Sequence, residues 1–157
     1  MELTSRDSNF SLMPLKIKFL VFSLLLFISN SAGAEEMAII VHPSNAITDL
    51  TLNDFKHLYL RRQKTFPNRI TAAPFDVADN AQLRDDFLML VTEKTSKQLE
   101  SYWAYLIFSG EGEPPIKVES YETMLKMVST NSGGIGYLPK SLVNDELVKV
   151  VLTINLE

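Results

Sequence analysis

Residues that could perform catalysis are few in this chain of 157 residues. It has no cysteine and only two histidines, His42 and His57. It also lacks a GxSxG nucleophile elbow, a Walker phosphate loop and any cluster with metal-ligand spacing. A single histidine without a partner base or nucleophile does not make a catalytic site. The sequence therefore predicts a protein that is not an enzyme and that uses no cofactor and no metal.

Anion binding is the chemistry that the residue types favour. A tetrahedral oxyanion needs several N–H and O–H donors that converge from helix N-termini, with a guanidinium adding charge and two parallel hydrogen bonds. Helices expected to start near Thr51, Asn80 and Ser120 would offer such ends, and Arg84 lies one turn into the second of them. We therefore expect Arg84 to be the bidentate contact of an oxyanion.

Two turns supply the other expected ligand contacts. Ser44 and Asn45 follow a short apolar run, and open α/β sheets bind ligands at the carboxyl ends of their strands. The same two residues could simply form a turn, where both are common. Two adjacent glycines after Ser132 indicate backbone angles or close approaches that a side chain would block. The expected ligand-binding residues are Ser44, Asn45, Asn80, Arg84, Ser132, Gly133 and Gly134.

The overall charge argues against nucleic acid as a partner. The chain has a net charge of −4, so its field disfavours phosphate backbones and anionic membrane surfaces. One short stretch departs from this pattern, because it gathers the bases Lys56, Arg61, Arg62, Lys64 and Arg69. This basic turn could face a partner or an anion, or it could simply be solvated.

The helix that begins after Thr51 is the best-defined element. Thr51 can cap its first turn, and Asp54 puts negative charge where the helix dipole is positive. Leu52, Phe55 and Tyr59 then form one apolar stripe that would face a core. The sequence therefore predicts an amphipathic helix that runs into the basic turn.

The other elements are predicted from apolar runs and from helical spacing. Strands are predicted at residues 37–41, 135–138 and 147–154, and residues 69–76 are predicted to be extended, with Pro74 at a strand end or an edge. Helices are predicted at residues 80–91, from 95 or 96 with the stripe Leu99, Tyr102, Trp103, Leu106 and Ile107, and at 121–128. Strands separated by helices indicate one α/β domain.

Three stretches, in the same order, resemble periplasmic phosphate-binding proteins, the solute receptors of phosphate ABC importers. They are Leu50 to Asn68, Asp76 to Phe87, and Gly133 to Tyr137. The resemblance implies an α/β fold of the type 2 periplasmic-binding-protein kind, with a mixed sheet flanked by helices in a single lobe. It also implies phosphate or another small oxyanion as ligand, and an ABC permease or another periplasmic or membrane protein as partner.

The sequence departs from these receptors in the segment that grips the anion. Val77, Asn80 and Ala81 stand where the receptors commonly have arginine, glycine and serine. The receptors also close two lobes on their ligand, whereas the resemblance covers one. The alternative function is therefore a periplasmic interaction module that kept the fold and lost the anion site.

The first 34 residues are expected to be a signal peptide. Lys16 and Lys18 precede an apolar run at residues 19–28, and Ala32-Gly33-Ala34 offers a cleavage site of small residues. The run is shorter than the ~20 residues that a membrane-spanning helix needs. Translation from either Met1 or Met13 would preserve this signal. Residues 35–157 are therefore expected to form one periplasmic-binding-protein-like domain in the periplasm.

Overall fold

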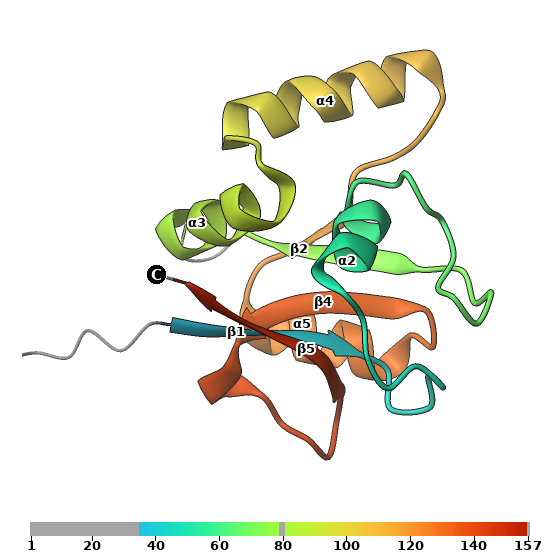
Figure 1. The fold of residues 1–157 in the computed structure, drawn as a ribbon, viewed down its shortest axis with the longest axis vertical. Coiled ribbons are helices and arrows are strands. Elements are labelled where there is room, and N and C mark those ends of the chain that lie inside the picture. Colours follow the sequence, from blue (N-terminus) through green and yellow to red (C-terminus); the bar gives the residue numbers. More distant parts are fainter. Residues whose placement is uncertain (1–34, 79–80, 157) are drawn as a thin grey trace, which may run out of the picture. The chain divides into compact units, whose positions relative to one another are not determined.

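The computed structural model describes residues 35–78 and 81–156. The expected signal peptide, and the expected cap of the second helix at Asp79 or Asn80, lie outside this part. The described residues build a five-stranded mixed sheet with the strand order β3-β2-β4-β1-β5 (Figure 1). The strands are β1 Glu35–Val41, β2 Ala73–Val77, β3 Ile116–Val118, β4 Gly134–Pro139 and β5 Lys149–Leu156. The helices are α2 Leu52–Tyr59, α3 Ala81–Thr92, α4 Ser96–Ser109, α5 Tyr121–Thr130 and the short 3-10 helix η1 Lys140–Leu142.

The directions of the strands define two ends of the sheet. β2 runs parallel to both β3 and β4, while β1 runs antiparallel to β4 and to β5. Val41 pairs with Ile135, and Ala73 pairs with Gly134. The end of β1 therefore lies beside the starts of β2 and β4, at what we call the Gly134 edge. The ends of β2, β3 and β4 lie at the opposite side, the Val77 edge.

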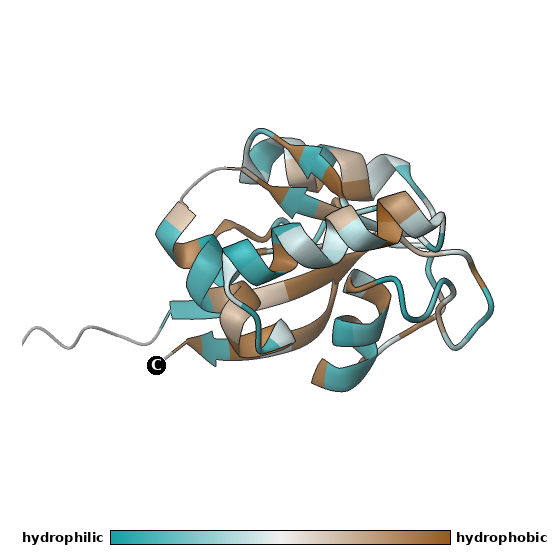
Figure 2. Cartoon of the chain, turned by 90° about the horizontal axis from the view of Figure 1, so that it is seen from above, coloured by the Kyte–Doolittle hydropathy of each residue, from teal (hydrophilic) through white to brown (hydrophobic). Residues whose placement is uncertain are grey.

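The central strands are buried because helices cover both faces of the sheet. The ring of Phe87 on α3 stacks on Tyr137 of β4 at 4.3 Å between centroids. On the other face, Met124 of α5 packs so closely over Gly136 that a Cβ there would lie 2.4 Å from its sulfur. Successive strand residues point to opposite faces, so α3 and α5 enclose β4 between them. Figure 2 shows the same arrangement as apolar strands between helices.

Helix α2 confirms the prediction made from its sequence. The hydroxyl of Thr51 accepts a hydrogen bond from the backbone N–H of Asp54, and the carboxylate of Asp54 accepts one from the backbone N–H of Thr51, both at 3.1 Å. Phe55 and Tyr59 are buried as expected. Leu52, in contrast, is exposed, so the buried stripe begins one turn later than predicted.

The structure corrects two details of the predicted elements. Strand β3 was not predicted, since three residues after a proline-rich loop carry no usable periodicity. On α4, Leu99 and Leu106 are buried and Trp103 is half-buried, but Ile107 is 57 % exposed and so does not belong to the core.

Pro74 is the second residue of β2, and pairing with β3 begins only at the next residue, which confirms the strand-end alternative.

No helix in the described part of the chain is both long enough and apolar enough to cross a membrane.

Candidate functional site

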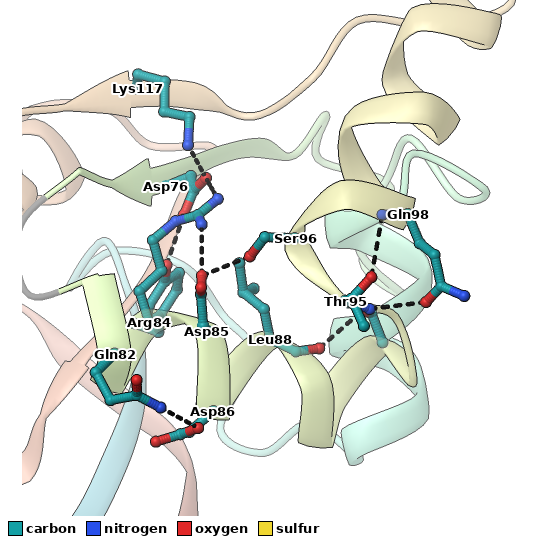
Figure 3. Close-up of polar contacts among 12 residues, drawn as sticks. Asp76, Gln82, Arg84, Asp85, Asp86, Leu88, Thr95, Ser96, Gln98 and Lys117 are labelled. Atoms are coloured by element: carbon teal, nitrogen blue, oxygen red, sulfur yellow. Dashed lines mark hydrogen bonds and ion pairs between the residues drawn. The ribbon is translucent and has the colours of Figure 1, made fainter.

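The carboxylate of Asp76 is the centre of a polar cluster at the Val77 edge (Figure 3). Its side chain is only 3 % exposed. Arg84 donates to it from Nε at 3.0 Å and from Nη2 at 2.7 Å, and the ammonium of Lys117 donates at 2.6 Å. The hydroxyl of Tyr137 donates at 2.5 Å. Four hydrogen bonds from three side chains therefore satisfy one buried carboxylate.

The parallel strands place these groups together. Asp76 pairs with Lys117 in the register between β2 and β3, so the two side chains leave adjacent strands at the same height. Tyr137 comes from β4 on the other side of β2, and Arg84 comes from the first turn and a half of α3. One carboxylate thus connects three strands and a helix. A buried charge needs such partners, since an unpaired one is strongly disfavoured.

The electrostatics of the cluster keep Asp76 and Arg84 charged and Tyr137 neutral. Burial alone would raise the pKa of Asp76, but the hydrogen bonds from Arg84, Lys117 and Tyr137 outweigh burial and hold that pKa below its ordinary value. Burial would lower the pKa of Arg84, but the hydrogen bonds and charge of Asp76 raise it. Burial and the nearby Asp76 charge raise the pKa of Tyr137, so its hydroxyl stays a donor.

The guanidinium of Arg84 makes contacts at all three of its nitrogens. Beyond the two bonds to Asp76, Nη1 donates to a carboxylate oxygen of Asp85 at 3.2 Å. Asp85 also accepts a hydrogen bond from the hydroxyl of Ser96 at 2.5 Å, which joins the start of α4 to the cluster. Lys117 is the accessible cation of the cluster, with 59 % of its side chain exposed.

A small cavity of about 180 Å³ opens beside this cluster. Its polar wall includes Lys117 and Glu100, and its apolar wall includes Trp103. The full lining is Asp76, Arg84, Ser96, Leu99, Glu100, Trp103, Pro114, Pro115 and Lys117. The cavity has room for several waters or one small polar ion. No group of acidic and histidine side chains in the described ranges has the arrangement of a metal site.

Two of the predicted ligand residues lie at the Gly134 edge and organise a loop there. Ser44 is exposed, and its hydroxyl lies 2.8 Å from Nδ1 of His42. Asn45 is buried, and its side-chain oxygen accepts hydrogen bonds from the backbone N–H of Ile47 at 3.2 Å and from the amide of Asn68 at 2.9 Å. These contacts match the alternative in which Ser44 and Asn45 form a turn.

The glycines after Ser132 lie at this edge too, and they allow close packing. A Cβ on Gly133 would lie 2.2 Å from the carbonyl oxygen of Thr71, and one on Gly134 would lie 2.9 Å from the carbonyl oxygen of Asn131. The close approach predicted for the paired glycines is therefore present. Ser132 itself is exposed.

The predicted ligand residues thus fall into two groups rather than one cage. Arg84 lies at the Val77 edge, whereas Ser44, Asn45 and the residues from Ser132 to Gly134 lie at the Gly134 edge. Asn80 is outside the described residues. The physical reason is that β1 runs antiparallel to β4, so the carboxyl end of β1 points away from the carboxyl ends of β2 and β4.

Sequence reasoning missed three residues of the cluster, which are Asp76 as a charge partner, Lys117 and Tyr137. One signal was available for Asp76, since an acidic residue inside an apolar strand must find a cation or a donor. Lys117 lies on the strand that was not predicted, and Tyr137 reads from the sequence as an ordinary core aromatic.

This fold matches one part of solved phosphate-binding proteins. A phosphate ABC transporter substrate-binding protein from Clostridium perfringens, solved with bound phosphate, superposes with a TM-score of 0.59 at 22 % identity over 75 % of this chain. An ABC-type phosphate transport receptor from Vibrio cholerae gives a TM-score of 0.60 at 19 % identity over 74 % of this chain. PstS from Borrelia burgdorferi gives a TM-score of 0.56 at 12 % identity over 75 % of this chain.

The chain spans about half the length of these structures, since it covers 45–47 % of each of them. No family model matches the sequence, and no curated protein is significantly similar to it. The similarity therefore lies in the fold, a mixed α/β sheet flanked by helices as in the periplasmic binding proteins. The named neighbours are binding proteins and receptors rather than enzymes.

Proposed function

We propose that this chain is an exported binding protein without catalytic activity, and that it binds a small oxyanion such as phosphate. The observation that carries the proposal is the convergence of Arg84 and Lys117 on one cavity at the Val77 edge. The parallel strands β2 and β3 both end there, and open α/β sheets bind their ligands at such ends. The fold is shared with a structure described as holding phosphate.

Lys117 is the group most open to a ligand. Its ammonium has three donors, of which one is used on Asp76, and most of its side chain is exposed. Of the residues on α3, Arg84 is the one that lines the cavity. Arg84 adds positive charge, and its Nη1 could exchange the more exposed Asp85 for an oxyanion.

The other residues predicted to bind the ligand do not belong to the proposed site, and their role in binding stays a prediction. Ser44, Asn45, Ser132, Gly133 and Gly134 lie at the Gly134 edge, away from this cavity. The proposed site therefore consists of Arg84 and Lys117, and Asn80 stays a predicted contact. In a transport role, the lobe would act in the periplasm with an ABC permease as its partner.

Calorimetry with phosphate, sulfate and acetate tests the proposal on the chain purified after export. Arg84→Ala should weaken oxyanion affinity at least roughly tenfold, on the scale of about 1.5–3 kcal/mol for a hydrogen bond to a charged group. Lys117→Ala should weaken it too, without uncovering the buried Asp76–Arg84 pair. Arg62→Ala on the basic turn is the matched control, and it should change affinity little except at low salt.

Two results would reject oxyanion binding. One is the absence of any binding heat at millimolar phosphate, sulfate and acetate. The other is unchanged affinity in both the Arg84 and the Lys117 variants, with folding verified by circular dichroism.

One observation supports an interaction module as the second candidate function. All three guanidinium nitrogens of Arg84 contact carboxylates, and Val77 and Ala81 lack the donors expected at their positions. An arginine neutralised in this way stabilises the fold without a ligand. A genomic neighbourhood with a permease and an ATPase would favour transport, and a wild-type chain that binds no anion would favour the module.

A further inference from the structure

Strand β5 is an outer strand of the sheet, and part of its backbone has no partner. Its neighbour on one side is β1. On its other side, the backbone N–H of Leu50 donates to the carbonyl of Val151 at 3.0 Å. Within the described ranges, no second strand pairs with the five residues that follow, Leu152 to Leu156. We call these five residues the β5 edge.

The contact with Leu50 shows which backbone groups of the β5 edge point outward. The carbonyl of Val151 points away from β1, because it bonds to Leu50 instead. The N–H of Leu152 lies on the opposite side of that planar trans peptide, so it points toward β1. Backbone groups along a strand alternate in direction from one residue to the next. The N–H and C=O groups of Thr153 and Asn155 therefore point outward, where the described residues offer them no backbone partner.

Pro139 on β4 supports this assignment independently. Proline has no N–H to donate, and Pro139 lies opposite Met37 of β1. Residues of a central antiparallel strand bond to one neighbouring strand and then to the other, in alternation. Met37 therefore directs its backbone groups to β5, where it lies opposite Ile154. The backbone of Ile154 thus faces inward, and the residues on either side of it face outward.

The β5 edge lacks the features that usually prevent exposed strands from pairing. Such features are charged side chains, proline, bulges and covering loops. The bulge of β5 comes before the edge, at the register shift between Ile39 and Ile40 of β1. The covering contact from Leu50 is made at Val151, also before the edge. The five residues of the edge read L-T-I-N-L and carry no charge. The edge is therefore open to an extended segment.

The apolar side chains of the β5 edge form one row on the sheet face that α3 covers. Leu152 lies opposite Ile39, and Ile39 lies opposite Tyr137, whose ring stacks on α3. Ile154 and Leu156 follow on the same face at a period of two. All three side chains of the row are half-buried, whereas the polar residues between them are exposed on the other face.

A groove of about 550 Å³ extends the apolar row onto α3. It lies between α3 and the end of β5, which are neighbours in Figure 1. The groove is lined by Asp86, Met89, Leu90, Asn155 and Leu156. Met89 and Leu90 are 44 % and 45 % exposed. The β5 edge therefore offers unpaired backbone groups together with an apolar surface beside them.

We propose that the β5 edge pairs antiparallel with the β5 edge of a second copy of this chain, about a two-fold axis at Ile154. Thr153 of each copy then lies opposite Asn155 of the other, and each of these two pairs exchanges two backbone hydrogen bonds. All the outward N–H and C=O groups of both residues are used. Ile154 meets Ile154 at the axis, and Leu152 lies opposite Leu156.

The backbone pattern selects this register and this occupant. An axis at Thr153 would place Asn155 opposite Val151, whose carbonyl is already used by Leu50. An axis at Asn155 would place Thr153 opposite a position beyond the end of β5. A second copy has an edge of the same length, with the same alternation and the same contact at Val151. The axis at Ile154 sets apolar residues against apolar ones on one face and polar against polar on the other.

The contact area and the charges fit a weak dimer. Two five-residue strands and the flanking grooves bury less than the ~1,200 Å² below which complexes are usually transient. Leu152 of the second copy lies opposite Leu156, at the mouth of the groove, and adds apolar contact there. No charged side chain of one edge faces the other edge, so no like charges oppose the pairing.

The pairing is independent of the proposed function. The residues that line the groove beside β5 and those that line the cavity at the Val77 edge are different sets. A dimer through β5 would therefore leave Arg84 and Lys117 accessible to an anion. Loss of oxyanion binding and loss of dimerisation can be observed separately.

Sedimentation equilibrium of the chain purified after export tests the proposal. We expect a concentration-dependent dimer with a Kd on the order of 100 µM. Asn155→Pro removes two of the four backbone bonds between the copies but none to β1, because this N–H points outward. It should weaken the dimer about tenfold or more. Asn155→Ala is the matched control, since it keeps the N–H, and it should dimerise like wild type. Circular dichroism verifies that both variants fold.

Two double variants test which residues lie opposite each other. Thr153→Lys with Asn155→Glu places opposite charges across both pairs, whereas Thr153→Lys with Asn155→Lys places like charges there. Cross-strand pairs of opposite charge stabilise and those of like charge destabilise. The first variant should therefore dimerise at least about twofold more tightly than wild type, and the second more weakly. Amide hydrogen exchange adds a direct reading, because the N–H groups of Thr153 and Asn155 should gain protection as concentration rises.

Cysteine crosslinking tests the position of the axis. The chain has no cysteine, so a single new one can form a disulfide only between copies. Ile154→Cys would bring two Cα atoms to about 4.5 Å, the spacing of a non-hydrogen-bonded pair, which a disulfide can span. Thr153→Cys is the matched control, because its two copies would lie on a diagonal at about 7–8 Å. Mild oxidation should crosslink Ile154→Cys faster, although Thr153 is the more exposed position.

Three results would overturn the proposal. The first is a wild-type chain that stays monomeric up to roughly 1 mM. The second is a dimer that tolerates Asn155→Pro, or one that Thr153→Cys crosslinks as fast as Ile154→Cys does. The third is a monomeric chain in which the amides of Thr153 and Asn155 gain protection only when an ABC permease is added, which would assign the β5 edge to the permease.

Discussion

Arg84 holds the buried carboxylate of Asp76 in a two-point contact, with Nε at 3.0 Å from one oxygen and Nη2 at 2.7 Å from the other. This geometry matches the fork of a guanidinium to the two oxygens of a carboxylate. Lys117 adds a third charged bond from the neighbouring strand. The arginine that the sequence predicts as a ligand contact is therefore also the principal partner of a structural carboxylate.

Removing the charge of Asp76 should destabilise the domain. Asp76→Asn keeps the size of the side chain but leaves Arg84 and Lys117 without their counter-charge. Breaking one partner of a buried ion pair typically costs about 3–5 kcal/mol. We expect the lower end of that range, because Arg84 and Lys117 both retain some access to water. Urea unfolding measures the change, and the exposed Asp145→Asn is the control, which should stay within about 0.5 kcal/mol of wild type.

The contribution of Asp76 should depend on pH in a defined direction. Its folded pKa lies below the ordinary value of 3.8, so the unfolded chain binds a proton there more readily than the folded chain does. The stabilisation is therefore fully present above that ordinary value, and it is lost as pH falls through the lower folded pKa. The difference in unfolding free energy between wild type and Asp76→Asn should be constant from about pH 5 to 7 and shrink below about pH 4. A difference that grows on acidification would contradict this assignment.

Local signals explain why several helices could be predicted from the sequence. The capping pairs of Thr51 with Asp54, and of Thr95 with Gln98, lie three residues apart, so the sequence alone displays them. Ser120 caps α5 in the same local way. The buried strand β1 was equally visible, as a continuous apolar run. These elements depend on neighbours in the chain rather than on the tertiary fold.

The arrangement of the candidate site depended on information that is not local. Ser44 was predicted as a ligand contact because it follows an apolar strand, and Arg84 because it lies one turn into a helix, and the two were expected to meet at the carboxyl ends of the strands. The antiparallel direction of β1 separates them, and strand direction follows from pairing between residues such as Val41 and Ile135, far apart in the sequence. The role of Asp76 likewise depends on a strand, β3, that is too short to predict.

The expected signal peptide gives a prediction about processing. Cleavage after Ala34 should produce a mature chain that begins at Glu35, because signal peptidase requires small residues such as Ala32 and Ala34 before the cut. Mass spectrometry of the exported protein measures the N-terminus directly. Ala32→Lys should block or displace the cut, whereas a conservative Ala32→Ser should not. Exported protein that still contains residues 19–28 would show that the segment is retained.

The turn at the Gly134 edge should tolerate no side chain at Gly133. A Cβ at that position would lie 2.2 Å from the carbonyl oxygen of Thr71, far inside van der Waals contact with a backbone atom that cannot rotate away. The carbonyl of Gly133 also accepts a hydrogen bond from the backbone N–H of Ala73 at 2.7 Å, so relief of the clash would strain the start of β2. We expect Gly133→Ala to cost about 1–3 kcal/mol, the usual range for overpacking.

Gly112→Ala is the matched control for this prediction. A Cβ there would meet Arg61 and Leu106 at 3.7 Å, which is an ordinary contact. The substitution should leave stability unchanged or raise it by about 0.4–1 kcal/mol, because alanine restricts the unfolded chain more than glycine does. The midpoints of thermal and urea unfolding should therefore shift in different directions for the two variants, or by clearly different amounts. Equal stability of both variants would mean that Thr71 and Gly133 are not packed as closely as described.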